Sequence, residues 1–473
     1  MKKTSILFPL FIFLLNVLAV LAVTTNKAEA VVDCLKITPA SSESDKNYCK
    51  KELASIEAEL EQLIAKKKEQ QKQTGTLKGD VNYLTSQINA LQTKIKARAL
   101  AIAQLRVSIN QKQSKIGSLS EKIQREHESL AELLRNTNEF DNENLVYLIL
   151  SDGSISDFYS DLESYASIKQ AVKDSVDVIR GVKNQTEIEK QELQKKQDAE
   201  ADAKVDLETS KTKVSQSEAE KKQLLAISQM RESEYQKLAA EKKAQAEKIR
   251  SALFNLAGTS QKIEFGTALI YAEEAKQKTG VDPAFLLAII TQESNLGANV
   301  GQCYLKNQTT GAGIGKNTGT PFSNVMKPMG LSGRKGDVED FLDITSKLGL
   351  KWDETPISCP IAGVAGYGGA MGPAQFIPTT WKLFETRLKS ALGYDANPWT
   401  PRDAFLASAM YLTDLGAIGS SYSSQIKAAC RYYGTGGTSC SYGLSVLSIK
   451  NKIQNNIDYL NQYGIAPLGK PVS

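Results

Sequence analysis

Apolar residues recur with a heptad period over a long stretch of the first half of the chain. A heptad sustained over this length predicts a coiled coil. At about 1.5 Å per residue the helix would be on the order of 120 Å long, so we expect an arm or spacer rather than a core. The apolar members of the heptad are Leu53, Ile56, Leu60, Leu63, Leu77, Val81, Leu84, Ile88, Leu91, Ile95, Ile102, Leu105, Ile109, Ile116, Leu119, Ile123, Leu130 and Leu133.

The heptad is interrupted by polar seam residues and then by a break in the pattern. Seam residues such as Arg98, Lys112 and Glu126 are either solvated interruptions or residues that fix the register. At about residues 136–170, Asn, Asp and Gly punctuate short apolar runs, and a weaker heptad then resumes. Two helices around a tip rich in Leu, Tyr and Phe predict an antiparallel hairpin over residues 45–250, and a parallel dimer of one continuous rod is the alternative.

The tip carries the first resemblance to a known family. The stretch "LVYLILSDGSISDFYSDLESYASIKQAVKDSV" between the two arms resembles the N-terminal module of PcsB, CwlO and EnvC-type cell-wall hydrolase regulators. In that family the arms restrain a catalytic domain, and the transmembrane FtsEX complex releases it. The resemblance therefore implies an FtsEX-type membrane complex as a partner of the coiled coil.

The character of the sequence changes past Ser251. Gly, Pro, Trp and Tyr now occur in globular proportions, and helical patterns become short and irregularly spaced. We expect an α-rich globular domain over residues 262–465. One helix is expected to end at Gly280, and Asp282 followed by Pro283 supplies the N-cap and the first-turn proline of the next.

That next helix carries a carboxylic acid among apolar residues. Leu286, Ile290 and Glu293 fall on one face, because they differ by four and three positions. Apolar surroundings raise the pKa of a carboxyl group, which would make Glu293 a proton donor near neutral pH. A general acid that protonates a departing glycosidic oxygen needs this property. The competing interpretation is structural: Glu293 caps a loop or meets a buried arginine.

Two later motifs supply groups suited to binding a sugar. The loop "GAMGPAQFIPTTW" (residues 369–381) combines close-approach glycines and aromatic residues with the amide of Gln375. The stretch "AACRYYGTGGTSCSYG" (residues 428–443) contributes Tyr433 and Tyr442, which could stack on a sugar face or form a hydrogen bond near the acid. A structural loop is the alternative for both.

Together the three stretches resemble the lytic transglycosylases, which have a lysozyme-like helical fold and cleave peptidoglycan between N-acetylmuramic acid and N-acetylglucosamine. "TQESNLG" matches the family's Glu-Ser motif and implies Glu293 as catalytic acid and base, and "GAMGPAQFIPTTW" matches the groove motif of membrane-bound lytic transglycosylase B relatives. "RYYGTG" stands where the family usually has Tyr-Asn-Gly, so Gly434 replaces the expected Asn. The implied substrate-binding residues are Ser294, Met371, Gln375, Phe376, Tyr433 and Tyr442.

The reaction that this resemblance implies needs one carboxyl group and forms a 1,6-anhydro sugar. Hydrolytic glycosidases place a second Asp or Glu across the scissile bond. The three motifs contain no such second carboxylate, although Asp395 or Asp403 could approach in space. A hydrolytic muramidase, a noncatalytic glycan-binding adaptor and a structural envelope spacer are the alternatives.

The six cysteines bear on both compartment and metal binding. In an exported chain they suggest disulfides, and their grouping suggests three pairs, with the connectivity left open. The only histidine, His127, is far from every cysteine in the sequence and no CxxC occurs, so we expect no metal site, and the implied reaction needs no cofactor. The candidate pairs are Cys34 with Cys49, Cys303 with Cys359, and Cys430 with Cys440.

The first residues predict export. Two lysines, an apolar run and the small residues Ala28 and Ala30 form a signal peptide over residues 1–30, with an uncleaved membrane anchor as the alternative. We therefore expect the protein in the periplasm, or at the cell wall or extracellular face. The formal net charge of +5 is too balanced to indicate nucleic-acid binding, and it is compatible with an anionic cell wall.

Overall fold

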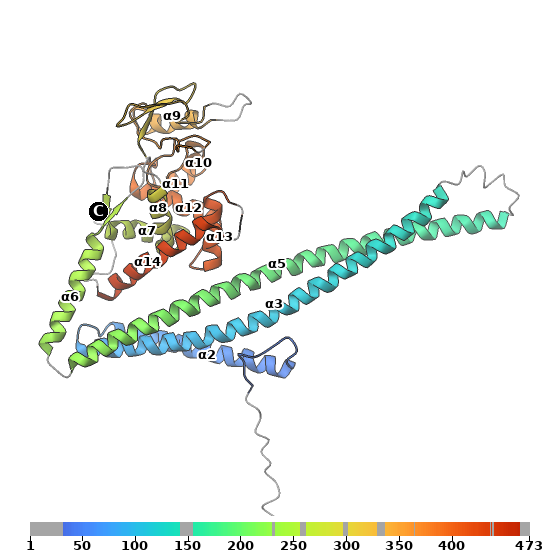
Figure 1. Cartoon of the computed structure of the whole chain (residues 1–473), viewed down its shortest axis with the longest axis horizontal. Coiled ribbons are helices and arrows are strands. Elements are labelled where there is room, and N and C mark those ends of the chain that lie inside the picture. The colour runs from blue at the N-terminus through green and yellow to red at the C-terminus, as the bar shows by residue number, and fades with distance from the viewer. Residues whose placement is uncertain are drawn as a thin grey trace, which may run out of the picture. The chain divides into compact units, whose positions relative to one another are not determined.

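Helices make up most of the computed structural model (Figure 1). The structure describes residues 32–141, 155–228, 232–255, 262–296, 301–328, 336–363, 365–435, 437 and 439–463. The predicted fold class, mainly α with a long helical region followed by an α-rich globular domain, is confirmed. The helices of the first region are α2 (Glu43–Gln71), α3 (Leu77–Asp141), α5 (Ile155–Ser228) and α6 (Glu232–Ser251).

The chain divides into two compact units, each made of segments far apart in sequence. The first unit combines Met1–Gln62 with Gln92–Ala203, and the second combines Leu63–Leu91 with Lys204–Ser473. The long helices α2, α3 and α5 run through both units. The end of α2, the start of α3 and the end of α5 therefore belong with the globular domain.

Within the first unit, α2 lies antiparallel to α3. The Gln104 side-chain amide donates a hydrogen bond to the Cys49 carbonyl oxygen at 2.8 Å, and the Arg98 guanidinium lies 4.0 Å from the Glu57 carboxylate. Partners nearer the start of α2 thus meet residues farther along α3, which is the order that antiparallel helices require. Arg98, a polar seam residue, finds its ionic partner across the two helices.

The single continuous helix expected over residues 53–133 is wrong, because the chain turns back between α2 and α3. Gly75 has φ 102°, a left-handed conformation that favours glycine. The Thr76 hydroxyl then accepts a hydrogen bond from the Gly79 N–H at 3.1 Å and caps the start of α3. The apolar heptad is the same on either side of this turn, so the heptad alone does not indicate it.

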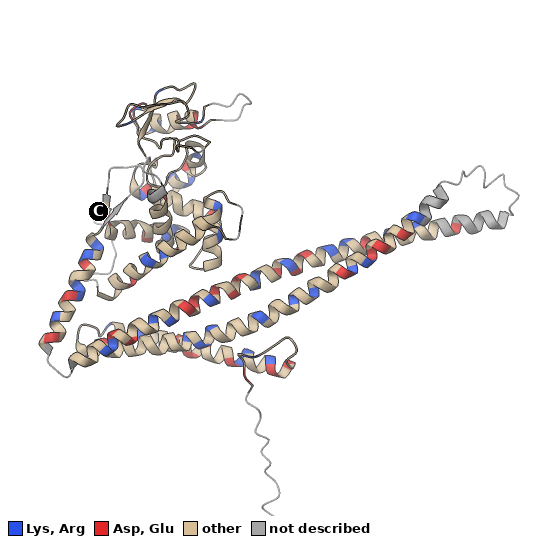
Figure 2. Cartoon of the chain, viewed as in Figure 1, with Lys and Arg blue, Asp and Glu red and all other residues tan. Residues whose placement is uncertain are grey.

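In the first unit, α3 and α5 also pair antiparallel. The Lys112 ammonium lies 2.6 Å from the Glu189 carboxylate, and the Arg106 guanidinium lies 3.0 Å from that of Glu200. Lys112 also pairs with Glu192. Figure 2 shows Lys and Arg interspersed with Asp and Glu along both helices. The polar seam residue Lys112 is therefore an inter-helix contact rather than a solvated interruption.

The second unit contains the globular domain, whose centre is α8. Every side chain of α8 from Ala284 to Ile290 is fully buried. Helices α7 and α14 pack on α8, and α12 contacts both α7 and α8. The helices of this domain are α7 (Phe265–Thr279), α8 (Pro283–Leu296), α9 (Asp337–Lys347), α10 (Pro378–Lys382), α11 (Glu385–Leu392), α12 (Pro401–Asp414), α13 (Tyr422–Tyr432) and α14 (Ser441–Tyr463).

Short strands accompany these helices. A two-stranded antiparallel ribbon pairs β1 with β2, and a three-stranded antiparallel sheet has the order β3-β4-β5. The three-stranded sheet lies between the two motifs that carry Glu293 and Gln375 in the sequence. The strands are β1 (Leu253–Asn255), β2 (Lys262–Glu264), β3 (Cys303–Leu305), β4 (Gly313–Gly315) and β5 (Pro321–Phe322).

All six cysteines form disulfides, in the three pairs that their grouping suggests. One pair fastens the segment before α2 to that helix and packs on Leu100 of α3. A second ties β3 to the segment that follows α9, and the third joins the last turn of α13 to the residue just before α14. The pairs are Cys34 with Cys49, Cys303 with Cys359, and Cys430 with Cys440.

Two predicted features lie wholly or partly outside the described residues. They are the signal peptide at residues 1–30 and the middle of the hairpin tip, residues 142–154. Within the described part of the chain, no helix is both long enough and apolar enough to cross a membrane.

Candidate active site

Helix α8 brings Glu293 from the core to the surface. The Asp282 carboxylate accepts a hydrogen bond from the Phe285 N–H at 3.0 Å, and Pro283 occupies the first turn, as predicted for the start of this helix. The buried apolar run then fixes α8 in the core, with Leu286 and Ile290 fully covered. Glu293 follows in the last turn and is partly exposed.

The Glu293 carboxyl group has one direct partner, Tyr442 at the start of α14. The Tyr442 hydroxyl donates a hydrogen bond to Glu293 Oε1 at 2.6 Å. Burial raises the pKa of Glu293, and the hydrogen bond from Tyr442 lowers it by a smaller amount. Burial, and then the nearby charge of Glu293, raise the pKa of Tyr442, so its hydroxyl keeps its proton and remains a donor.

A second tyrosine, Tyr432, connects this acid to the glycine-rich loop. Its hydroxyl donates a hydrogen bond to the Ala374 carbonyl oxygen at 3.1 Å. Burial, and after it the charge of Glu293, raise the pKa of Tyr432. Tyr432 therefore lies within electrostatic range of Glu293 while it holds the loop over residues 369–381. The structure thus brings all three sequence motifs to one place.

Tyr433 lies beside Tyr442, and its role in binding substrate stays a prediction. Its ring is 57% exposed and stacks on the Tyr442 ring, with centroids 4.8 Å apart and an interplanar angle of 13°. Of the two tyrosines predicted in this motif, Tyr442 contacts Glu293 and Tyr433 covers Tyr442. The sequence prediction missed Tyr432, although it lies three, four and seven positions after the buried residues Ala429, Ala428 and Gln425 of α13.

The loop that holds Gln375 is tightly folded. The Met371 N–H donates to the Phe376 carbonyl oxygen at 2.9 Å, and the Gln375 side-chain amide donates to that of Gly372 at 2.7 Å. Gln375 has φ 54°, the only positive value for a residue other than glycine among the described residues. A left-handed conformation is costly for such a residue and is found preferentially at functional sites.

Two of the residues expected to bind substrate are core residues instead. Met371 is buried, and the buried Phe376 ring packs among Trp381, Phe384 and Tyr411, with centroids 5.8 to 6.0 Å away. Because these side chains are covered by protein, they anchor the loop to the core and are not accessible to a ligand. Gln375 is the partly exposed residue between them.

A comparison with family models bears on the class of this domain. Residues 190–418 match the model of the transglycosylase SLT domain. Residues 190–418 are therefore similar to the SLT domain. Searches of curated proteins and of solved structures found no match. The SLT domain acts on peptidoglycan, and it agrees with the predicted α-rich, lysozyme-like domain.

The SLT match and the candidate site overlap in part. Glu293 and Gln375 lie inside the matched residues, whereas Tyr442 lies after their end. The match begins in α5, inside the predicted hairpin. Its limits differ from those predicted for the globular domain, residues 262–465, so these domain bounds stay a prediction. The match gives no support to an FtsEX-type partner, so that partner and the PcsB-like resemblance also stay predictions.

The two aspartates considered as a second catalytic carboxylate have structural partners. Asp403 is buried and accepts hydrogen bonds from the Tyr394 hydroxyl at 2.7 Å and the Asn397 N–H at 2.9 Å. Asp395 pairs with the Lys389 ammonium at 2.8 Å. Among the described residues, no second carboxylate shifts the pKa of Glu293. The Ser294 side chain lies outside the described residues.

Proposed function

We propose that this protein cleaves the N-acetylmuramic acid to N-acetylglucosamine bond of peptidoglycan as a lytic transglycosylase, with Glu293 as its acid and base. The observation that carries the proposal is the state of Glu293: a partly exposed carboxyl group whose pKa is raised by burial and which is held by Tyr442. A raised pKa keeps a fraction of the carboxyl protonated near neutral pH, which a proton donor to a glycosidic oxygen requires.

The reaction uses this one carboxyl group twice. Protonated Glu293 gives its proton to the glycosidic oxygen, and the bond between that oxygen and C1 of the N-acetylmuramic acid breaks. The Glu293 carboxylate then takes the proton of the C6 hydroxyl of the same sugar as O6 attacks C1. The products are an N-acetylglucosamine end and a 1,6-anhydro ring, and Glu293 is protonated again. No water is consumed.

Tyr442 supports both states of the acid. Its hydroxyl donates to Glu293 Oε1 and so fixes the direction of the carboxyl group. The hydrogen bond is stronger when the carboxyl is ionised, because a bond to a charged acceptor is the stronger kind. Tyr442 therefore stabilises the carboxylate that must act as base in the second step.

A single-carboxylate mechanism agrees with the surroundings of Glu293 better than hydrolysis does. Hydrolytic enzymes of the usual two-carboxylate type place the second group about 5 to 9.5 Å from the first. Asp395 and Asp403 are each committed to partners elsewhere in the domain. A hydrolytic muramidase and a noncatalytic glycan-binding adaptor remain as the alternatives that an experiment must separate.

Product analysis tests the proposal. Purified peptidoglycan is digested with the full chain, either wild type or Glu293→Gln, and the soluble products are identified by mass spectrometry. We expect 1,6-anhydro products from the wild type and none from Glu293→Gln. Reducing-end products would instead indicate a hydrolase, and retention of binding without any product would indicate an adaptor.

We further propose that the coiled coil positions or restrains the SLT domain. Support comes from the helices themselves, since the end of α5 and all of α6 belong to the same compact unit as the domain. The Lys213 ammonium on α5 lies 2.6 Å from the Asp458 carboxylate on α14, the helix that carries Tyr442. An FtsEX-type membrane complex is the partner that the resemblance of residues 45–250 implies.

A further inference from the structure

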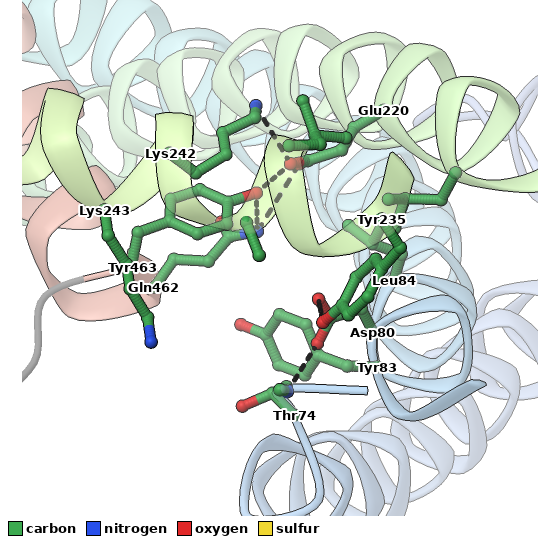
Figure 3. A pocket seen from close by; sticks show the side chains of 14 residues that line it. Thr74, Asp80, Tyr83, Leu84, Glu220, Tyr235, Lys242, Lys243, Gln462 and Tyr463 are labelled. Atoms are coloured by element: carbon green, nitrogen blue, oxygen red, sulfur yellow. Dashed lines mark hydrogen bonds and ion pairs between the residues drawn. The ribbon is translucent and has the colours of Figure 1, made fainter. Parts of the chain in front are cut away.

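A cavity lies in the same compact unit as the SLT domain, away from Glu293. It has a volume of about 320 Å³ and is lined by the turn between α2 and α3, the start of α3, the end of α5, α6 and the end of α14. Figure 3 shows Tyr463 and Gln462 on one side of this cavity and Tyr83, Asp80 and Tyr235 on another. Tyr463 is 21 positions after Tyr442, so the cavity is roughly 30 Å from the acid's partner along α14.

The cavity has a fixed shape because its carboxylates are held by neighbours. Asp80 accepts hydrogen bonds from the Gly75 N–H at 3.0 Å and from the Tyr235 hydroxyl at 2.9 Å. Glu220 accepts from the Lys242 ammonium at 3.3 Å and also from the Tyr463 hydroxyl. These two sets of contacts involve all five lining segments, and α6 takes part in both.

Aliphatic and aromatic side chains form the rest of the wall. Leu84, Leu224 and Tyr235 are buried in one cluster beneath the cavity, and Tyr83 belongs to the same cluster. Three tyrosines, Tyr83, Tyr235 and Tyr463, therefore line one small space. Aromatic rings beside carboxylates and donors suit a ligand with both an apolar face and hydroxyl groups.

Two donors at this cavity have no protein partner. Within the described part of the chain, neither the Tyr83 hydroxyl nor the Lys243 ammonium makes a hydrogen bond or ion pair. Burial, and then the charges of Asp458 and Glu220, raise the pKa of Tyr83 to about 12, so its hydroxyl stays protonated. The cavity thus offers two free donors as well as the remaining lone pairs of Asp80 and Glu220.

We propose that this cavity is an accessory subsite that binds a sugar ring of the glycan strand. The inference rests on the proposed function, which makes glycan the substrate. The Tyr83 hydroxyl and Lys243 ammonium donate to hydroxyl or acetamido oxygens, while Asp80 and Glu220 accept from sugar hydroxyls. The two carboxylates of the wall are balanced by the ammonium groups of Lys242 and Lys243, so the lining carries no net charge and suits a neutral hydroxylated ring.

The test measures sugar binding at Tyr83 in the full chain without cleavage. The Glu293→Gln protein is labelled with 3-fluorotyrosine, and the Tyr83 resonance is assigned by its loss in Tyr83→Phe. Peptide-free glycan oligosaccharides are then titrated and followed by fluorine NMR. We expect the Tyr83 signal to shift, and Tyr83→Phe or Lys243→Ala to weaken binding at this site about fivefold, the usual effect of one hydrogen bond.

Matched variants separate this effect from general changes. Tyr48→Phe removes the hydroxyl of an exposed tyrosine on α2, and Lys248→Ala removes another exposed lysine of α6. Both should bind glycan as the parent does. Because Tyr83→Phe deletes a hydroxyl without a protein partner, its thermal unfolding should match that of the parent.

Two outcomes overturn the assignment. A Tyr83 signal that ignores glycan while other tyrosine signals shift would confine binding to the Glu293 site and leave the proposed function intact. A shift with inorganic phosphate but not with glycan would make the cavity an anion site. The proposed function fails in a different way: the wild-type protein would release no products from peptidoglycan, although glycan would still shift the Tyr83 signal.

Discussion

Two opposing influences act on the carboxyl group of Glu293. Burial raises its pKa, and the hydrogen bond from Tyr442 lowers it. The proposed reaction starts from the protonated acid, so the rate should fall as pH rises through the pKa of Glu293 in the folded protein. Burial moves this loss of activity to higher pH than an exposed glutamate would give.

Tyr442→Phe should move the alkaline limb of the pH profile to still higher pH, because it removes the influence that lowers the pKa of Glu293. The same change should reduce the maximal rate, since the carboxylate loses its donor. The measurement is kcat/KM for peptidoglycan cleavage against pH. Tyr433→Phe is the matched control, because Tyr433 stacks on Tyr442. An alkaline limb that stays in place in Tyr442→Phe would contradict the assigned role.

Gln375 allows strain and function to be measured at one position. Its left-handed backbone, at φ 54°, costs a residue with a Cβ about 1 kcal/mol, a cost that glycine avoids. Gln375→Gly should therefore have a free energy of unfolding about 1 kcal/mol higher than Gln375→Ala, although both lose the hydrogen bond to Gly372. Denaturant unfolding of the two variants provides the measurement.

Equal stability of the two Gln375 variants would mean that the loop relaxes without strain. Activity gives the second readout: both variants should cleave peptidoglycan more slowly than wild type if the amide contacts the glycan. A fully active Gln375→Gly would show that the loop serves only the fold.

The residues of the site were predictable to different degrees. Glu293 could be found because a carboxyl group in an apolar helix stands out. The pairing of Glu293 with Tyr442 could not, because Tyr433 and Tyr442 both follow α12 in the sequence and only the packing of α14 on α8 selects one. The burial of Met371 and Phe376 could not be predicted either, because a sequence motif does not show which side of a loop faces the core.

Among the elements, the junction of α13 and α14 has most effect on the site. The disulfide between Cys430 and Cys440 closes this junction, with Tyr433 inside the closed loop and Tyr442 just beyond it. The longer disulfide, between Cys303 and Cys359, instead ties the three-stranded sheet to the segment after α9. The two bonds should therefore affect activity and stability differently.

Removing each disulfide by paired Cys→Ala changes tests this difference. In the chain-entropy model, loss of the Cys303–Cys359 bond costs about 4 kcal/mol and loss of the Cys430–Cys440 bond about 3 kcal/mol. We expect the larger drop in the free energy of unfolding from the first pair and the larger drop in kcat from the second. Denaturant unfolding and cleavage assays on the same preparations give both numbers. A larger drop in kcat from loss of the Cys303–Cys359 bond would show that the junction of α13 and α14 has no special role in catalysis.

The long helices show what a hydrophobic pattern can and cannot predict. The heptads predict long helices on both sides of the tip, but they fit a parallel dimer as well as the antiparallel pairing of α3 and α5. They do not predict the turn at Gly75, because the same seven-residue spacing fits a straight helix and one that folds back. The physical signal was the local Gly, which takes a left-handed conformation, with Thr76 as the cap after it.

At the scale of the whole molecule, the division into two units changes how the arms should be removed. Residues 63–91 and 204–250 share a unit with the SLT domain, and their helices supply the buried cluster of Tyr83, Leu84, Leu224 and Tyr235. Deleting all of residues 45–250 would therefore expose apolar surface of the second unit. A cut confined to the first unit avoids this.

Replacing residues 120–181 by a short Gly/Ser turn shortens α3 and α5 while leaving the second unit whole. We expect the thermal unfolding of the SLT domain to be unchanged, because none of its contacts is removed. If the arms restrain the domain, cleavage of whole cell walls should increase, which is the expected result. Equal or slower cleavage by a fully folded variant would count against restraint.

The disulfide beside Tyr442 also has a consequence for timing. A chain newly made in a reducing compartment keeps Cys430 and Cys440 as thiols, so the junction that positions Tyr442 is not yet closed. On this view, the site is fully formed only after Cys430 and Cys440 are oxidised to a disulfide. Under the proposed function, the protein would cut the polymer that encloses its own cell, and chemical maturation after synthesis would then act as a safeguard.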